Sequence, residues 1–400
     1  MSITAEVIQK DKQYSVPVAA RPEFVLARGQ GVTLYDADGK AYTDWVAGIA
    51  VNALGYGDQE LMDAVSAQMG RGLIHVSGLY HTQALAELAE LLCVNSFADK
   101  VYFCNSGAEA NEGALKFARK LAYMNEKPDK TKVVSFTQAF HGRTMGALAL
   151  TPTDKYQTPF KPMMPGSVVG EFNNIESASE CIDPETAAVI VEPIQGEGGI
   201  NIATAEFLQA LRRLCDEHDA VLIFDEIQCG LGRTGELWAH SFAGISPDIM
   251  TLAKPLAGGL PVGAILTSDK VAGAMNPGDH GSTFSGGAVV LRAAEVVINR
   301  VLSPGFMEQV AEVGEYLLER LSEINSPHIT DVRGRGLMAG IELDIAPAGV
   351  VNAGYEHGLL LVSSGTNVVR FVPPLIVQKR HVDELVEKLT IILEDIDVED

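Results

Sequence analysis

The sequence predicts an α/β protein whose main sheet is largely parallel, and two observations favour this fold class. Short apolar runs alternate with longer helical patterns through the middle of the chain, as in proteins whose helices cover both faces of a parallel sheet. The run 220–224 (AVLIF) is continuously apolar, which is typical of a strand buried on both faces. Residues 204–218, directly before it, carry apolar side chains at helical spacing, so one face of this helix is expected to be buried.

Further apolar runs predict the other strands of this sheet. In chain order they occupy residues 100–105, 132–136, 186–191, 248–253 and 262–267. A helical pattern over 108–124 follows the first of them. Because ligands of such sheets bind at the carboxyl ends of the strands, polar residues that follow these runs are the candidates for a functional site.

The pattern changes after Gly281, where the sequence predicts a smaller α+β domain. Helical patterns cover 289–301, 307–324 and the end of the chain (apolar side chains at 382, 385, 386, 389 and 392), and short strand patterns cover 336–343, 359–362 and 368–371. Two more strand patterns, 31–35 and 40–45, flank a turn near the N-terminus. We therefore expect an N-terminal segment, 1–55, packed on the small domain, a large ligand-binding domain, 56–285, and a small C-terminal domain, 286–400.

The composition excludes several classes of protein. Of the 400 residues, 47% are hydrophobic and 20% are charged, which is the balance of an ordinary globular protein. Lys and Arg number 30 against 52 Asp and Glu, and the net charge of −22 repels nucleic acid. No run approaches the roughly 18 apolar residues of a membrane helix, and the five cysteines are widely spaced without a C-x-x-C pair. We therefore expect a cytoplasmic protein with neither nucleic acid nor membrane as a partner and without a metal site.

Two candidate site segments follow predicted strands. In the run 105–108 (NSGA) the serine hydroxyl and the first N–H groups of the next helix could hold a phosphate, although an ordinary N-cap is the alternative. Asp225 ends the apolar run 220–224, where a carboxylate needs a cationic or N–H partner such as the protonated nitrogen of a pyridine ring. Strand periodicity places the Ile227 side chain on the same face of the chain as Asp225, where it could lie against a flat ring. A helix cap or a metal ligand is the alternative for this aspartate.

Lys254 and the run 140–143 (FHGR) complete the set of candidates. Lys254 follows a buried apolar run, and burial lowers the pKa of a lysine and makes it a nucleophile. A salt-bridged surface lysine is the alternative. Phe140 could stack on a flat ring, or simply lie in the core, and Arg143 could hold a carboxylate. A phosphate cradle, a partner for a ring nitrogen, a stacking aromatic and a buried lysine together are the components of a pyridoxal-phosphate site.

These residues lie in longer motifs that resemble one family over nearly the whole chain. The motifs are 105–111 (NSGAEAN), 139–144 (AFHGRT), 192–199 (EPIQGEGG), 224–228 (FDEIQ), 232–235 (GRTG), 252–254 (LAK), 281–284 (GSTF) and 332–334 (VRG). Their combination resembles the class III, ornithine/acetylornithine-type aminotransferases that use pyridoxal phosphate. The resemblance implies fold type I, in which a large domain has a mainly parallel seven-stranded sheet and a smaller α+β domain follows.

The resemblance also implies roles in binding the cofactor. Lys254 is expected to bond covalently to pyridoxal phosphate and to carry the proton that the reaction exchanges, and Asp225 is expected to keep the ring nitrogen protonated. Phe140 and Ile227 would stack on the two ring faces, and Gln228 would bond near the phenolic oxygen. The phosphate would be held by Ser106, Gly107, Ala108 and, from the neighbouring subunit, Thr283. A homodimer is therefore the expected working unit.

The expected substrate contacts follow from charge. By resemblance, Arg143 would bind the α-carboxylate of N-acetylornithine or the side-chain carboxylate of glutamate, and Ser282 would contribute to the same end of the acylated substrate. Arg370 would take the α-carboxylate of glutamate or 2-oxoglutarate. Glu197 would pair with Arg370 while the ω-amino substrate is bound.

Within the family the motifs most resemble those of the acetylornithine aminotransferases. The expected reaction converts N-acetylornithine and 2-oxoglutarate into N-acetylglutamate 5-semialdehyde and glutamate. In arginine biosynthesis the net flow of this reaction runs in the opposite direction. The sequence departs from the family pattern at 285–288 (SGGA), 55–59 (GYGDQ) and Gly78. By resemblance, these positions are expected near the substrate entrance or the dimer interface. Other donors therefore stay open: succinylornithine, succinyl-diaminopimelate, N-acetyl-lysine, ornithine and 4-aminobutyrate. An aminomutase, a decarboxylase or a non-catalytic cofactor-binding protein are alternatives of other classes.

Overall fold

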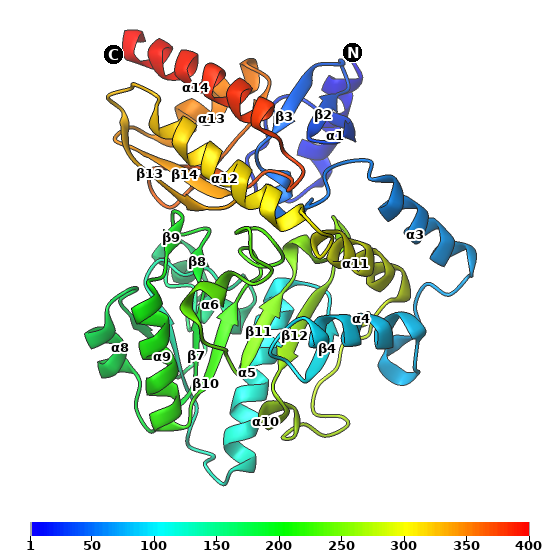
Figure 1. Ribbon diagram of the computed structural model, residues 1–400, viewed down its shortest axis with the longest axis vertical. Coiled ribbons are helices and arrows are strands. Elements are labelled where there is room, and N and C mark those ends of the chain that lie inside the picture. Colours follow the sequence, from blue (N-terminus) through cyan, green and yellow to red (C-terminus); the bar gives the residue numbers. More distant parts are fainter. Residues whose placement is uncertain (1, 400) are drawn as a thin grey trace.

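The computed structural model describes residues 2–399, so the terminal residues of the expected ranges 1–55 and 286–400 lie outside it. Its largest sheet has seven strands in the order β4-β12-β11-β10-β7-β5-β6 (Figure 1). The strands are β4 (Lys100–Cys104), β5 (Lys132–Phe136), β6 (Ser167–Gly170), β7 (Thr186–Val191), β10 (Val221–Asp225), β11 (Ile249–Leu252) and β12 (Gly263–Thr267). The mainly parallel sheet predicted from the sequence is present.

One of the seven strands, β12, runs opposite to the other six. Strand β10 is parallel to β11 and β7, and β5 is parallel to β7 and β6. Strand β12 runs antiparallel to both β11 and β4. All five residues of β12 are buried, so its apolar run predicts a buried strand without indicating its direction.

Helices on both faces bury alternate residues of the strands. Helix α5 (Gly107–Met124) packs on one face against residues that include Val221 and Ile223 of β10. Helix α9 (Ala205–His218) packs on the other face, where Leu222 and Phe224 lie. The alternation along β10 places Asp225 on the α5 side of the sheet, at the end where the strand leaves the core.

The C-terminal part of the chain forms a second sheet with its own core. This sheet has the antiparallel order β13-β14-β17-β16. Its strands are β13 (Ile329–Arg335), β14 (Met338–Leu343), β16 (Val362–Ser364) and β17 (Val368–Phe371). The helices of this region are α11 (Ala288–Val301), α12 (Phe306–Ser322), α13 (Pro347–Glu356) and α14 (Lys379–Glu399). Apolar side chains of α12, α14, β14 and β17 form one core cluster.

The N-terminal strands extend toward the C-terminal sheet. Strands β1 (Leu26–Gln30), β2 (Thr33–Asp36) and β3 (Ala41–Asp44) form an antiparallel set, and β3 pairs in parallel with β15 (Leu359–Leu360). Residues 1–55 thus contribute to a sheet that contains a C-terminal strand. The division of the chain at residues 55 and 285 stays a prediction.

Short elements connect these layers. They are α1 (Ile3–Tyr14), α2 (Ala47–Ala50), α3 (Gln59–Gly70), α4 (Gln83–Val94), α6 (Met145–Ala149), α7 (Asp154–Gln157), α8 (Ile175–Cys181), α10 (Asp269–Ala272) and a two-stranded hairpin of β8 (Ile194–Gln195) and β9 (Asn201–Ile202). Within residues 2–399 no helix is both long enough and apolar enough to cross a membrane. In the same range no three His, Cys, Asp or Glu side chains gather as metal ligands do.

Several sequence-based boundaries differ from the structure by one to three residues. The strand expected at 359–362 is split between β15 and β16, and the helix expected at 307–324 ends at Ser322. Strands β1, β6 and β13 were not expected. Exposed and half-buried residues make up most of their length, so no continuous apolar run or clean alternation marks them.

The close packing of α12 on the turn between β13 and β14 yields a prediction. A Cβ on Gly314 would lie 2.3 Å from the carbonyl of Gly336. We expect Gly314→Ala to lower the free energy of unfolding by about 1–3 kcal/mol through overpacking. Gly349→Ala, in α13, is the matched control, because its Cβ would meet nothing within 4 Å, and it should stabilise by about 0.5–1 kcal/mol. Urea denaturation measures both changes, and equal changes would contradict the packing.

Candidate active site

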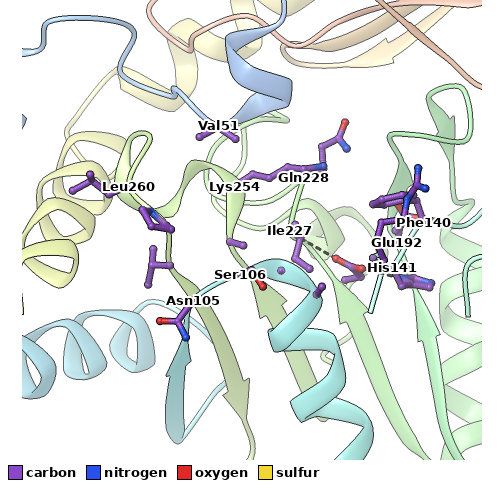
Figure 2. A pocket seen from close by; sticks show the side chains of 18 of the residues that line it. Val51, Asn105, Ser106, Phe140, His141, Glu192, Ile227, Gln228, Lys254 and Leu260 are labelled. Atoms are coloured by element: carbon purple, nitrogen blue, oxygen red, sulfur yellow. Dashed lines mark hydrogen bonds and ion pairs between the residues drawn. The ribbon is translucent and has the colours of Figure 1, made fainter. Parts of the chain in front are cut away.

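A cavity of about 400 Å³ opens at the carboxyl ends of the central strands (Figure 2). Its walls come from the N-terminus of α5, the segments that follow β5, β7, β10 and β11, and the turn before β12. The lining residues are Val51, Asn105, Ser106, Gly107, Ala108, Phe140, His141, Gly142, Arg143, Glu192, Asp225, Ile227, Gln228, Ala253, Lys254, Gly259, Leu260, Pro261 and Val262. The structure thus brings together nine predicted residues: Ser106, Gly107, Ala108, Phe140, Arg143, Asp225, Ile227, Gln228 and Lys254.

The first turn of α5 forms the floor of the cavity. Ser106 is the N-cap, and its hydroxyl accepts a hydrogen bond from the backbone N–H of Glu109 at 3.2 Å. The Glu109 carboxylate accepts from the backbone N–H of Asn105, the residue before the N-cap, at 2.8 Å, so Ser106 and Glu109 together close the start of α5. The first backbone N–H groups of a helix lack partners within the helix and attract anions. A Cβ on Gly107 would lie 2.9 Å from the Ile227 side chain, so only glycine fits there.

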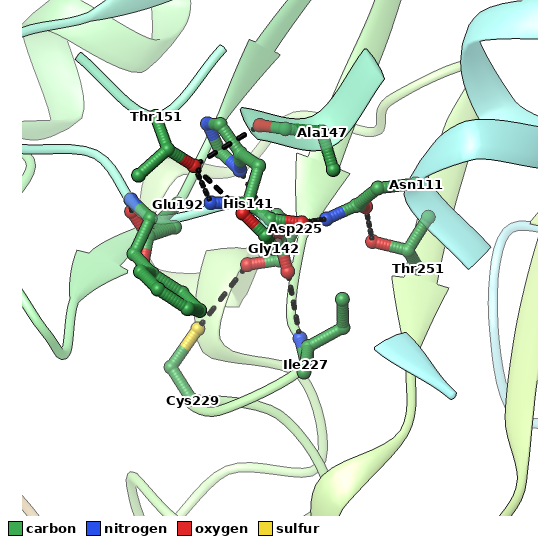
Figure 3. Close-up of polar contacts among 11 residues, drawn as sticks. Asn111, His141, Gly142, Ala147, Thr151, Glu192, Asp225, Ile227, Cys229 and Thr251 are labelled. Carbon is green, nitrogen blue, oxygen red and sulfur yellow. Dashed lines mark hydrogen bonds and ion pairs between the residues drawn. The ribbon is translucent and has the colours of Figure 1, made fainter. Parts of the chain in front are cut away.

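Asp225 is buried at the end of β10 and is held by three hydrogen bonds (Figure 3). Its Oδ2 accepts from Asn111 Nδ2 and lies 2.8 Å from His141 Nδ1. Its Oδ1 accepts from the backbone N–H of Ile227 at 3.1 Å. Thr251 donates to Asn111 Oδ1 at 2.8 Å, so the amide nitrogen of Asn111 faces Asp225. The carboxylate is therefore oriented before any ligand binds, and a carboxylate with three partners can still accept another donor.

Lys254 follows β11 at the start of a 3₁₀ turn, 254–257. Positive φ angles at Gly258 and Gly259, 58° and 112°, let the chain bend sharply after it. Desolvation lowers the pKa of Lys254, and the nearby charge of Arg370 lowers it further, although the carboxylates of Glu197 and Asp225 oppose that shift. A larger fraction of this amine is therefore neutral than for an exposed lysine, and a neutral amine is the nucleophilic form.

Glu192 is a second buried carboxyl group of the cavity wall. Its Oε2 accepts a hydrogen bond from the backbone N–H of Phe140 at 3.0 Å. Burial, reinforced by the nearby charge of Asp225, raises the pKa of Glu192 well above its usual value. Glu192 thus stays protonated at pH values where an exposed glutamate is ionised.

Glu197 and Arg370 form an ion pair beside the cavity. Arg370 is fully buried in β17, and its Nη1 donates to Glu197 Oε1 at 2.8 Å and to Gly196 O at 2.9 Å. The same nitrogen donates to Gln228 Oε1 at 3.0 Å, so the predicted contact of Gln228 with a cofactor oxygen would share this amide with Arg370. Burial alone raises the pKa of Glu197, but the charges of Arg370 and Lys254 outweigh it, and the pKa lies below its ordinary value.

The remaining predicted residues are placed differently. The Arg143 guanidinium lies 3.5 Å from the centroid of the Tyr156 ring, and within residues 2–399 no carboxylate pairs with it. Ser282 accepts a hydrogen bond from Asn105 Nδ2 at 2.8 Å, outside the cavity lining. Thr283 is exposed and does not line the cavity of its own chain.

Comparison with known proteins decides the family. Residues 15–393 match the family described as Aminotransferase class-III. The chain belongs to the class-III aminotransferases. This membership confirms the resemblance drawn from the motifs and the expected class of enzyme.

Named relatives cover nearly the whole aminotransferase. It is 50% identical to an acetylornithine aminotransferase, mitochondrial, of Alnus glutinosa over 396 residues, or 97% of this chain and 87% of that one. It is 42% identical to a succinylornithine transaminase of Yersinia enterocolitica, covering 97% and 96% of the two chains. A solved ornithine aminotransferase of Toxoplasma gondii, described as showing partial occupancy of PLP at its active site, superposes with a TM-score of 0.94 at 30% identity, covering 99% and 95%. This likeness confirms the predicted fold.

Three side chains of the aminotransferase site were not assigned a role from the sequence. They are Asn111, His141 and Glu192, and all three lie within the quoted motifs. Asn111 and His141 do not directly follow a predicted apolar run, whereas Glu192 directly follows the run 186–191, as Asp225 and Lys254 follow theirs. His141 is buried, and its Nε2 lacks a hydrogen-bond partner within residues 2–399. The sequence could have indicated these residues only as polar side chains in segments next to predicted strands.

The raised pKa of Glu192 predicts a pH-dependent difference in stability. The folded-state pKa lies above the unfolded value, so the stability that the acid form contributes is complete below about pH 4.5 and is lost as the pH rises through the folded pKa. Glu192→Gln keeps an oxygen that can accept the Phe140 N–H and removes the titration. We expect the variant to gain stability relative to wild type as the pH rises. Urea denaturation from about pH 5 to pH 8 measures this, and a difference that does not change with pH would contradict it.

Proposed function

We propose that this aminotransferase uses pyridoxal phosphate to transfer the δ-amino group of N-acetylornithine to 2-oxoglutarate. The products are N-acetylglutamate 5-semialdehyde and glutamate. The observation that carries the proposal is one cavity that contains Lys254, Asp225 and the open N-terminus of α5 in a class-III aminotransferase. The identity to a named acetylornithine aminotransferase supports the donor. We place the enzyme in the cytoplasm, which its free cysteines support.

The residues of the cavity fit pyridoxal phosphate. The N-terminus of α5 suits a phosphate, and the oriented carboxylate of Asp225 suits a protonated ring nitrogen. Phe140 and Ile227 both line the cavity and supply apolar surface for the ring. A volume of about 400 Å³ lies within the roughly 300–1,000 Å³ of small-molecule sites.

In the proposed mechanism the chain positions charges and moves one proton. When bound, pyridoxal phosphate supplies an electron-poor ring that stabilises negative charge on the substrate carbon. Lys254 removes the proton from that carbon at its neutral Nζ, and desolvation favours this neutral form. Asp225 accepts the hydrogen bond of the ring nitrogen and is kept in place by Asn111 and His141. Pro261 and Val262 add apolar surface to the lining of the same cavity.

The Glu197–Arg370 pair allows one site to accept two kinds of substrate. While N-acetylornithine is bound, Glu197 neutralises Arg370, so the ω-amino end meets no bare cation. When glutamate binds, its α-carboxylate replaces Glu197 on Arg370. Arg143 has no carboxylate partner within residues 2–399 and is exposed at the cavity wall, so it is available for the carboxylate end of the acylated substrate. We assign Ser282 to the same end of the substrate.

The working unit in this proposal is a homodimer, in which Thr283 reaches the phosphate of the neighbouring subunit. Thr283 is exposed and lies outside the cavity of its own chain. Its neighbour Phe284 is 70% exposed and contacts the His75 ring, beside the exposed Leu79 and Tyr80. An apolar surface of this kind on a soluble chain marks an interface.

Succinylornithine is the second candidate donor. The observation that favours it is the 42% identity to a succinylornithine transaminase over nearly the full length of both chains. Both donors carry an acylated α-amine and the same δ-amine, so they differ only in what the acyl group contacts.

Absorbance spectroscopy of the purified enzyme loaded with pyridoxal phosphate tests the proposed function. N-acetylornithine should remove the visible band of the bound cofactor, and 2-oxoglutarate should restore it. Lys254→Ala is the control and should lower turnover by at least about 10³-fold, because it removes the group that moves the proton. A visible band that is removed only by succinylornithine would identify succinylornithine as the donor and would not change the proposed class of enzyme. Turnover of Lys254→Ala at the wild-type rate would contradict the mechanism.

The charge of Glu197 predicts an asymmetric effect on the two half-reactions. Glu197→Gln keeps the shape of the side chain but leaves Arg370 without its counter-ion while N-acetylornithine is bound. We expect kcat/KM of the N-acetylornithine half-reaction to fall about tenfold and that of the glutamate half-reaction by less than about threefold. Single-turnover absorbance measurements give both values. Equal losses in the two half-reactions would refute the switch.

A further inference from the structure

The turn that carries Glu197 lies between the two sheets. It joins β8 to β9, and Figure 1 shows this hairpin directly beside β13 and β14. The hairpin is anchored to the large sheet by Gln195, whose Nε2 donates to Thr137 O at 2.8 Å. Within the hairpin Asn201 Nδ2 donates to Gly198 O at 3.0 Å, and further hydrogen bonds reach the turn from the C-terminal sheet.

Hydrogen bonds from the C-terminal sheet hold three carbonyl groups of this turn. The Ser364 hydroxyl donates to Gly196 O at 2.7 Å, and the Gly365 N–H donates to Glu197 O at 2.8 Å. Arg333 donates from both Nε and Nη2 to Gly199 O, at 2.9 and 2.7 Å. Arg370 also donates to Gly196 O, so the first half of the turn has several anchors, whereas Arg333 holds the carbonyl of Gly199.

Arg333 is itself fixed by two carboxylates. Its Nη1 donates to Asp331 Oδ2 at 2.7 Å and also to Glu342. Asp331 lies two residues earlier in β13 and pairs in register with Glu342 of β14, so all three side chains share one face of the sheet. Asp331 and Glu342 hold the Nη1 side of the planar guanidinium. The Nε and Nη2 atoms can therefore both donate to the single carbonyl of Gly199.

The turn needs such an anchor because of its composition. Gly198 and Gly199 have no side chains to pack, and Gly199 has a φ of 113° that favours glycine. A turn of this kind is mobile unless its backbone is bonded elsewhere. Where its backbone is fixed, Glu197 can leave and rejoin Arg370 only by rotation of its own side chain.

We infer that Arg333 is a positioning residue that fixes the turn bearing Glu197 and thereby sets the preference of the site between the ω-amino donor and the dicarboxylic substrate. The inference rests on the proposed function of the Glu197–Arg370 pair. Without the hydrogen bonds from Arg333 the turn is less fixed, and Glu197 forms its ion pair with Arg370 less often. The half-reaction that needs the closed pair, that of N-acetylornithine, should suffer, while the binding of a dicarboxylate to Arg370 should not.

Arg333→Met and Arg335→Met form a matched pair for the test. Arg335 lies on the same strand but donates to Glu236 and does not contact the turn. In Arg333→Met, kcat/KM of the N-acetylornithine half-reaction should fall about tenfold, whereas that of the glutamate half-reaction should stay within about twofold. The Kd of 2-oxoglutarate, measured by calorimetry, should stay within about twofold or decrease. Arg335→Met should change neither of the two kcat/KM values nor the Kd of 2-oxoglutarate.

A second variant guards against a simple loss of folding. Arg333→Lys keeps a charge for Asp331 and Glu342 but loses the fork to Gly199 O, and it should show the same asymmetry at a smaller size. Equal losses in both half-reactions, or the same asymmetry in Arg335→Met, would overturn the inference while leaving the proposed function intact.

A wild-type enzyme that is inert toward N-acetylornithine would instead refute the proposed donor. The same kcat/KM values, measured for the succinylornithine and glutamate half-reactions, would then test the inference.

Discussion

The burial of one carboxylate, Asp225, is the constraint on which the arrangement of the site depends. A carboxylate removed from water is costly unless donors replace its hydration. Its donors come from α5, from the segment after β5 and from its own strand, so three separate stretches of chain must meet at one point. Because Asn111 must reach Asp225 from one turn inside α5, the first turn of that helix ends at the cavity. The same contact therefore fixes both the carboxylate and the anion-binding end of the helix.

Two glutamates of one segment show how environment separates residues of the same type. Glu192 is buried and lies near Asp225, so its pKa is raised, and within residues 2–399 its one hydrogen-bond partner is the backbone N–H of Phe140. Glu197, five residues later, lies against the Arg370 guanidinium, and its pKa is lowered. The first can therefore support Phe140 without adding a second negative charge beside Asp225, and the second can serve as the counter-ion of Arg370. Opposite shifts in neighbouring acids are a recurring basis for dividing roles in a site.

Residues set by local pattern could be predicted from the sequence, and residues set by distant contacts could not. The buried strand β10 and helix α9 follow from a continuous apolar run and a helical periodicity, and Asp225 and Lys254 stand out because each follows such a run. The direction of β12 has no local signal, since an apolar strand reads the same in both orientations. The partners of Asp225 are 84 and 114 residues away in sequence, so only the folded chain shows that His141 and Asn111 belong to the same network.

The residues that define the site also show why the two sheets must act together. The proposed cofactor region belongs to the large sheet, whereas Arg370, Ser364 and Arg333 reach the Glu197 turn from the C-terminal sheet. The buried Arg233 adds a contact at the same junction, donating to Leu337 O at 3.1 Å and to Pro373 O from the segment after β10. The proposed cofactor site therefore depends on the large sheet, whereas the proposed Glu197–Arg370 switch also depends on contacts from the C-terminal sheet. A change that tilts one sheet on the other would alter the Glu197–Arg370 pair while leaving the hydrogen bonds between Asp225, His141 and Asn111 unchanged, because those bonds lie wholly within the large sheet and its helices.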